Sequence, residues 1–132
     1  MLDNNPNNFG IISFQMKHLL EKIYTKQKIL KWFKANEIIK NTGQFVGGVQ
    51  ILKKNKHSSN IINTWVNNMI YHLINDDTDN EEQYFKVNRH DQSIYSVIVK
   101  KFGSIKLSDE TWFEDYDDGK NFPILAKRNY II

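Results

Sequence analysis

The chain contains no cysteine, which excludes a disulfide framework and any metal site built on thiolates. It also lacks a long hydrophobic run, because no apolar stretch approaches the roughly 20 residues that a membrane-spanning helix needs. Residues 1–8 are polar and have neither the basic region nor the apolar core of a signal peptide. We therefore expect a cytoplasmic protein without a membrane span.

Arginine is scarce, since Arg89 and Arg128 are the two arginines among 18 basic residues. The net charge is +3, and acidic residues are interspersed with the lysines. The sequence also lacks a glycine-rich nucleic-acid signature and an aromatic strand motif. We therefore expect no nucleic-acid partner.

What is present is sufficient for a packed core. Hydrophobic residues make up 40% of the chain and aromatic residues 13%. A chain of this length can bury about two-thirds of its unfolded surface. We expect residues 1–132 to form a single domain, or a piece of one.

The hydrophobic pattern predicts an α/β or α+β fold. The clearest strand is Val46–Leu52, and the clearest helix runs from a cap at Ser58 or Ser59 to about residue 75. The remaining expected elements are a strand at 10–14, a helix at 25–33 capped by Thr25, a loop or short strand at 35–44, a helix at 91–102 and a short strand at 104–107.

Two glycines, Gly47 and Gly48, interrupt the clearest strand. Glycine weakens a strand, so paired glycines usually mark a bulge or a close approach of another backbone. We expect one of these two features here.

A polar cluster, residues 88–92, runs directly into an apolar helical pattern. Asn88 or Asp91 can cap that helix, and Gly103 stands where a C′ residue with positive φ belongs. One interpretation is an ordinary helix start with solvated side chains. The other is a site for a sugar and a diphosphate, because carboxylate and amide groups bind hydroxyls and arginine neutralises phosphate.

Three blocks in this order, residues 41–52, 88–95 and 109–113, resemble a family of GT-A-type glycosyltransferase-like proteins from bacterial polysaccharide loci and large DNA viruses. The resemblance covers residues 10–128 and is to the C-terminal part of such proteins. It implies an incomplete GT-A-like (nucleotide-diphospho-sugar transferase-like) domain, a small mixed sheet with packed helices and Val46–Leu52 at its centre. A viral member would act in the host cytoplasm.

The resemblance implies a role for each residue of the cleft that it predicts near the twin glycines. Asp91 would be the catalytic base or would orient the sugar, and His90 would carry a proton or bind a metal. Val46 and the twin glycines stand where related transferases have an Asn-Ala-Gly-like segment, which leaves the asparagine role empty. The implied substrate-binding residues are Gln44, Gly47, Gly48, Arg89, Gln92, Trp112 and Arg128.

GT-A enzymes hold Mn²⁺ or Mg²⁺ with an Asp-x-Asp motif, because paired carboxylates suit a cation that bridges a diphosphate. The sequence offers Asp77-Thr78-Asp79 and Asp115-Tyr116-Asp117, but both lie in polar segments and we interpret them as solvated acidic turns. The resemblance thus implies that the nucleotide-binding and metal-binding half is missing. The chain would then be a truncated form, or a partner chain would supply that half. The nucleotide sugar and a glycan acceptor would be the ligands.

Two alternatives remain open. The chain can be a non-catalytic remnant or an interaction protein. The His90-Asp91 pair is also similar to metal-dependent phosphohydrolases, which need three or four converging ligands and for which His72 is a further candidate. We expect His72 to be half-buried, His57 to be exposed, His18 to have a surface or capping role, and Trp112 to be buried if it does not stack on a sugar.

Overall fold

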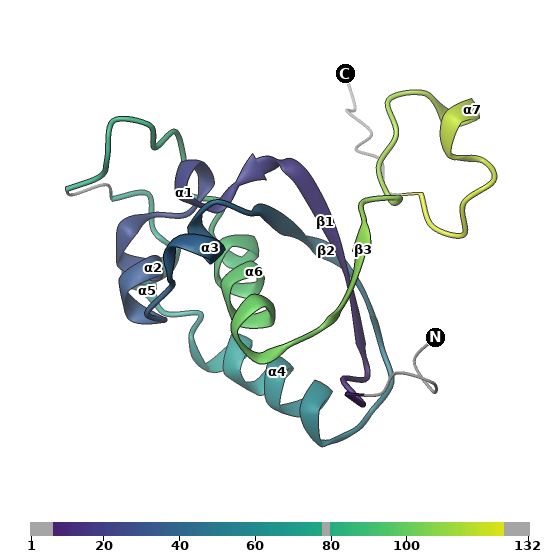
Figure 1. Cartoon of the computed structure of the whole chain (residues 1–132), viewed down its shortest axis with the longest axis horizontal. Helices are drawn as coiled ribbons and strands as arrows, with labels where there is room; N and C mark the ends of the chain where they lie inside the picture. Colours follow the sequence, from purple (N-terminus) through teal and green to yellow (C-terminus); the bar gives the residue numbers. More distant parts are fainter. Residues whose placement is uncertain (1–6, 78–79, 126–132) are drawn as a thin grey trace.

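A computed structural model describes residues 7–77 and 80–125 of the chain. A three-stranded mixed sheet carries helices on one face, which makes this a mixed α/β fold (Figure 1). The small mixed sheet with packed helices agrees with the sequence prediction. In the part of the chain that the structure describes, no helix is long and apolar enough to cross a membrane.

The sheet has the strand order β2-β1-β3. The central strand is β1, Ile11–Leu20, which pairs antiparallel with β2, Gly43–Leu52, and parallel with β3, Ile105–Ser108. The prediction that Val46–Leu52 lies at the centre is therefore wrong, because β2 is an edge strand. Strand order depends on pairing between distant segments, which local periodicity does not reveal.

Helix α6, Asp91–Phe102, packs across the sheet and supplies five of the eleven buried residues of the hydrophobic core, more than any other element. Seven consecutive residues, from Ser93 to Val99, are buried. The Tyr95 hydroxyl reaches through to β1 and lies 2.6 Å from the Ser13 hydroxyl. Both predicted ends of this helix are confirmed, and Gly103 has the expected positive φ of +106°.

Helix α4, Lys56–Asn67, lies beside α6 on the same face (Figure 1). Its N-cap is Asn55, whose side chain and that of Ser58 form a reciprocal capping box. The prediction of Ser58 or Ser59 as the cap is therefore wrong by three residues or more. The predicted helix to residue 75 is also wrong: Asn68 ends α4, and a separate turn, α5 at Tyr71–Ile74, follows.

Three short helices connect β1 to β2: α1 at Glu21–Tyr24, α2 at Gln27–Trp32 and α3 at Glu37–Lys40. The expected helix at 25–33 is thus present as α2. Thr25 does not cap it, however, because its hydroxyl donates to the Glu21 carboxylate instead. Helix α3 occupies part of the segment that we expected to be a loop or a short strand.

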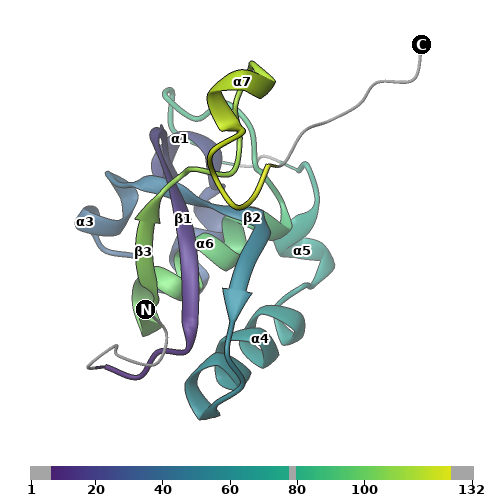
Figure 2. The ribbon, with the colours of Figure 1, turned by 90° about the vertical axis from the view of Figure 1, so that its right-hand side faces the viewer.

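The opposite face of the sheet is covered by the segment that follows β3, which includes the short helix α7, Tyr116–Gly119. Figure 2 shows this segment passing in front of the sheet. Ile12 and Phe14 of β1 lie beneath it and are 5% and 2% exposed. An apolar hollow lies between the sheet and this segment. Its lining includes Ile12 and Phe14 of β1 and Pro123 and Ile124 of the segment.

Candidate functional site

A cleft with a volume of about 430 Å³ opens where the twin glycines of β2 meet the start of α6. Two chain segments that are about forty residues apart in the sequence line it together. The lining residues are Gly47, Gly48, Val87, Asn88, Arg89, His90, Asp91 and Gln92. The predicted meeting of the polar cluster with the glycine strand is therefore present in the fold.

The glycines lie in a bulge of β2. Ser13 pairs with Gln50 and Gln15 with Phe45, so two steps along β1 correspond to five along β2. The excess residues include Gly47, whose backbone comes so close to α6 that an added Cβ would lie 2.9 Å from the Gln92 Cβ. The strand thus shows both features that paired glycines indicated, a bulge and a close approach.

Asn88, a cleft residue just before α6, is held in place by hydrogen bonds of its side chain. Asn88 is 2% exposed, and its side chain donates to the Leu73 carbonyl at 3.0 Å and accepts from the Lys26 backbone N–H at 3.4 Å. Because these bonds occupy its amide group, Asn88 does not cap α6. Asp91 does not cap it either, since it is the first residue of the helix.

His90 occupies the N-cap position in a rare backbone conformation, with φ 52° and ψ −119°. For a residue with a side chain, such a conformation costs free energy of the order of 1–3 kcal/mol. The His90 ring nitrogen Nε2 lies 2.6 Å from the Asp76 carboxylate, and both side chains are accessible to solvent. This contact fastens the loop before α6 to the acidic loop at the cleft edge.

The acidic loop is itself held in place by buried contacts to α2. Lys26 is 2% exposed and donates to the Asn75 carbonyl at 3.1 Å, and burial lowers the pKa of this lysine. Glu81 accepts from the Gln27 backbone N–H at 3.0 Å, and burial raises the pKa of its carboxyl group. These contacts hold Asn75, which precedes Asp76, and Glu81 against the start of α2.

Arg89 and Asp91 place opposite charges in the same cleft. The Arg89 guanidinium lies over the Tyr24 ring, 5.9 Å from its centroid, and its backbone N–H donates to the Tyr24 carbonyl at 3.1 Å. The Asp91 carbonyl accepts from the Trp65 indole N–H at 3.0 Å. The Asp91 carboxylate is exposed and has no hydrogen bond or ion pair to the residues that the structure describes.

Gln44 does not line the cleft, contrary to the prediction that it faces it. Its side chain is fully buried and lies beneath Gln92, whose amide donates to its oxygen at 2.8 Å. Its own amide nitrogen donates to the Thr25 hydroxyl, the Tyr24 carbonyl and the Ser93 hydroxyl, at 2.8, 3.0 and 3.1 Å. Gln44 therefore supports the cleft and does not contact a ligand in it.

Gln92 connects the two walls of the cleft. Its side-chain oxygen accepts from the Gly47 backbone N–H at 3.1 Å, while its nitrogen donates to Gln44. These two bonds set the orientation of its amide. Gln92 thus has a structural role, and its substrate-binding role stays a prediction.

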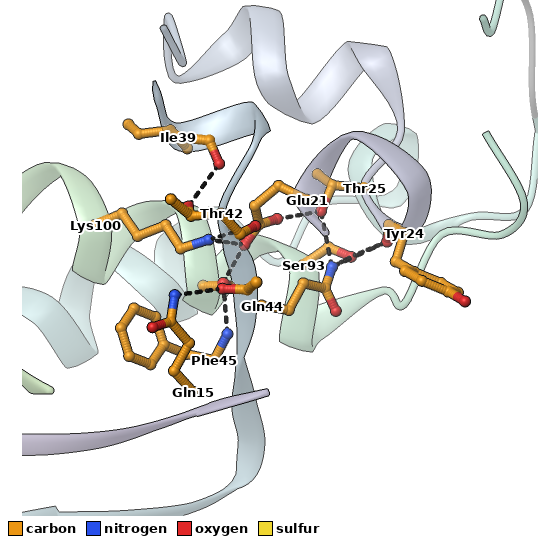
Figure 3. Close-up of polar contacts among 12 residues, drawn as sticks. Gln15, Glu21, Tyr24, Thr25, Ile39, Thr42, Gln44, Phe45, Ser93 and Lys100 are labelled. Atoms are coloured by element: carbon orange, nitrogen blue, oxygen red, sulfur yellow. Dashed lines mark hydrogen bonds and ion pairs between the residues drawn. The ribbon is translucent and has the colours of Figure 1, made fainter. Parts of the chain in front are cut away.

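The network continues from Gln44 to a buried ion pair (Figure 3). Glu21 has no solvent exposure, and its carboxylate accepts from the Thr25 and Ser96 hydroxyls and from the Lys100 ammonium, the last at 2.9 Å. Burial lowers the pKa of Lys100, and the adjacent Glu21 carboxylate opposes that shift. Lys100 also donates to the Thr42 carbonyl at 3.3 Å. In the described residues, every buried side-chain nitrogen or oxygen has a partner.

The other predicted site residues are not in the cleft or cannot be placed. Trp112 is 49% exposed, so its expected burial is wrong, and it is not among the residues that line the cleft. Arg128 lies outside the described residues.

The remaining histidines are distributed over the fold. His18 and His72 are exposed, so the expected half-burial of His72 is wrong. His57 is partly buried within α4, contrary to the expectation of exposure, and its ring nitrogen lies 2.7 Å from the Gly103 carbonyl.

The second Asp-x-Asp segment begins a helix and is not a turn, because Asp115 is the N-cap of α7. Asp77 accepts from the Asn75 side chain, and Asp115 accepts from the Asp117 backbone N–H. Thr78 and Asp79 lie outside the described residues. Within residues 7–77 and 80–125, no group of three or more His, Asp or Glu side chains is placed to hold a metal ion.

Sequence reasoning missed three residues that shape the cleft: Asp76, Tyr24 and the supporting role of Asn88. The acidic run after α5 was a usable signal for Asp76, because acidic side chains near a histidine favour an ion pair. Tyr24 and Asn88 carry no such signal, since their contacts join segments that lie far apart in the sequence.

The cleft can bind a polar ligand through one free carboxylate, one guanidinium and exposed glycine backbone. Comparisons of the chain with known protein families, with curated proteins and with solved structures found no match. The glycosyltransferase resemblance therefore stays a prediction.

Proposed function

We propose that the chain takes part in glycosyl transfer from a nucleotide sugar, with sugar and acceptor bound in the cleft at the start of α6. The carrying observation is the Asp91 carboxylate, which has no partner among the described residues and shares this cleft with Arg89 and with glycine backbone that lacks side chains. A carboxylate accepts hydrogen bonds from sugar hydroxyls, and the glycine backbone lets a flat ligand approach closely. The strain at His90 adds support, because such conformations cluster at functional sites.

Asp91 is the proposed base of the reaction. It takes the proton of an acceptor hydroxyl while the acceptor oxygen forms a bond to the anomeric carbon of the sugar. The bond between that carbon and the diphosphate oxygen breaks, and its electron pair leaves with the nucleoside diphosphate. Arg89 would offset the charge that develops on the diphosphate.

The nucleotide and a Mn²⁺ or Mg²⁺ ion would be held by a second half that a partner chain supplies. The described residues fit this division, because their carboxylates do not converge on a cation position. The same observation removes support from the phosphohydrolase alternative, which needs several converging ligands within this chain.

Ligand binding by the isolated chain tests the proposal. Because the proposal assigns the sugar and the diphosphate to this chain, we expect nucleotide sugars to raise its melting temperature in a saturable way without Mn²⁺. Free nucleoside diphosphates should bind more weakly than their sugar conjugates. The Asp91→Asn variant should lose about 10- to 100-fold in affinity, because a hydrogen bond to a charged group contributes about 1.5–3 kcal/mol.

Asp118→Asn is the matched control, since it neutralises an exposed carboxylate in α7 outside the cleft. Its affinity should equal that of the unmodified chain. If none of UDP-glucose, UDP-galactose, UDP-N-acetylglucosamine and GDP-mannose changes the melting temperature, the result favours the non-catalytic remnant.

A further inference from the structure

A second groove, with a volume of about 400 Å³, lies between α4 and the C-terminal end of α6. It is at the opposite end of α6 from the cleft, because Phe102 lines the groove and Asp91 lines the cleft. A twelve-residue helix is about 18 Å long, so the two sites are separate. The groove has no part in the proposed transfer reaction.

Three asparagines of α4 line this groove: Asn60, Asn63 and Asn67. They are three and four residues apart, so they lie on one side of the helix on successive turns. All three are exposed, and none is hydrogen-bonded to another residue that the structure describes. Asparagine is also a poor residue for a helix interior, so helix stability does not explain this row.

The neighbouring asparagines behave differently. Asn55 caps α4 and donates to the Asn8 carbonyl at 3.0 Å. Asn68 ends the helix, donates to the Thr64 carbonyl at 2.7 Å and accepts from the Trp32 indole N–H at 3.0 Å. These amides have structural partners, whereas the three in the groove remain available to a ligand.

Two side chains with rings, Phe102 and His57, also line the groove. Phe102 is 53% exposed at the end of α6. His57, beside it in the groove lining, is fixed by its contact with the Gly103 carbonyl, and its ring centroid lies 5.1 Å from that of Phe9. The lining residues include no lysine, arginine or carboxylate, so an anionic ligand would find no fixed counter-charge.

We propose that this groove binds a neutral oligosaccharide chain. Amides donate and accept together, which matches the hydroxyl groups of a sugar, and an exposed aromatic ring packs against the C–H face of a pyranose. The repeated spacing of the amides along α4 matches a ligand built of repeating polar units. The groove therefore holds a glycan chain at a distance from the cleft.

A nuclear magnetic resonance titration tests this assignment on the full chain. Cellohexaose, maltohexaose and chitohexaose are added separately at millimolar concentration to ¹⁵N-labelled protein. We expect at least one of them to shift the side-chain amide signals of Asn60, Asn63 and Asn67 in a saturable way. The backbone signals of Gly47 and Gly48 should move little.

The decisive variant replaces all three asparagines with alanine. Alanine favours helix more than asparagine does, so the melting temperature should not fall, and a loss of binding cannot be attributed to unfolding. We expect at least a tenfold loss of affinity for the oligosaccharide. Asp91→Asn should leave this affinity unchanged, which separates the groove from the proposed transferase cleft.

Four results would overturn the proposal. One is the absence of saturable shifts with all three oligosaccharides, and a second is equal binding by the triple alanine variant. The third is a set of shifts confined to the cleft residues. Displacement of the oligosaccharide from the groove by a polyanion such as heparin would contradict the assigned ligand class.

Discussion

Glu21 is a fully buried carboxylate, yet hydrogen-bond donors surround both of its oxygens. Removal of one partner from a buried ion pair costs about 3–5 kcal/mol, because the remaining charge is left without compensation. The Glu21–Lys100 pair is joined through Thr25 to Gln44, and Gln44 orients Gln92 at the cleft wall. The geometry of the cleft thus depends on a charge that no ligand can reach.

The raised pKa of the buried Tyr95 hydroxyl leads to a prediction for the stability of the protein at alkaline pH. Burial raises the pKa of Tyr95 from 10.0 to about 12. Between these two values the unfolded chain loses the proton while the folded protein keeps it, so the free energy of unfolding falls as the pH rises. The full effect is about 2.7 kcal/mol at most, and urea denaturation between pH 7 and pH 12 measures it.

Tyr95→Phe isolates this effect from the titration of other groups. At neutral pH the variant should lose about 1 kcal/mol, because one buried hydrogen bond is removed while Ser13 keeps its bond to Ser104. Between pH 10 and pH 12 the variant should lose less stability than the unmodified protein. An equal loss in both proteins would show that Tyr95 does not contribute.

At the scale of elements, the close contact between β2 and α6 depends on the absence of a side chain at Gly47. A Cβ on Gly47 would lie 2.9 Å and 3.0 Å from the Cβ and Cα of Gln92, whereas a Cβ on Gly48 would meet no atom within 4 Å. We expect Gly47→Ala to destabilise the protein by about 1–3 kcal/mol. Gly48→Ala should change the stability by less than about 0.5 kcal/mol.

The comparison of these two variants by urea-induced unfolding is internally controlled, because the residues are adjacent and chemically identical. A similar free-energy change in both would mean that β2 does not approach α6 as described. A large loss for Gly48→Ala alone would point to contacts on the other side of the strand.

The sequence predicted the elements that have strong local signals. Helix α6 was predictable because Ile94, Val97 and Ile98 have helical spacing and Gly103 marks the end. The break after α4 was missed, although Asn67 and Asn68 are poor helix residues, because the apolar spacing continues through Ile70. A local hydrophobic pattern indicates where a helix forms, but it is a poor guide to where a helix is interrupted.

The candidate site followed from the sequence in part. The glycines indicated a close neighbour of the strand, and the family resemblance implied that residues 88–92 would lie there. The inward position of Gln44 was not, because it depends on partners from three separate segments. The local sequence does not distinguish a glutamine that binds sugar from one that supports the wall of a cleft.

For the whole molecule, the segment after β3 determines whether one face of the sheet contacts water. Deletion of residues 109–132 should expose Ile12 and Phe14, and each of these side chains would lose on the order of 1.5–3 kcal/mol of burial energy. The truncated protein should unfold at lower urea concentration and bind the dye ANS. A variant that lacks only residues 126–132 is the matched control.

The two truncations should differ clearly in dye fluorescence. If the longer deletion binds no more dye than the shorter one, the segment of residues 109–125 does not cover the sheet. A stable, dye-free protein without residues 109–132 would contradict the described packing.

The position of β1 between β2 and β3 has a consequence for biosynthesis. Ser13 makes side-chain contacts with Tyr95 and Ser104, which lie 82 and 91 residues further along the chain. A ribosome therefore delivers the middle strand well before its parallel neighbour. Since such distant pairings form slowly, one edge of β1 stays unpaired in the nascent chain until β3 has been synthesised, and it is open to chaperones during that time.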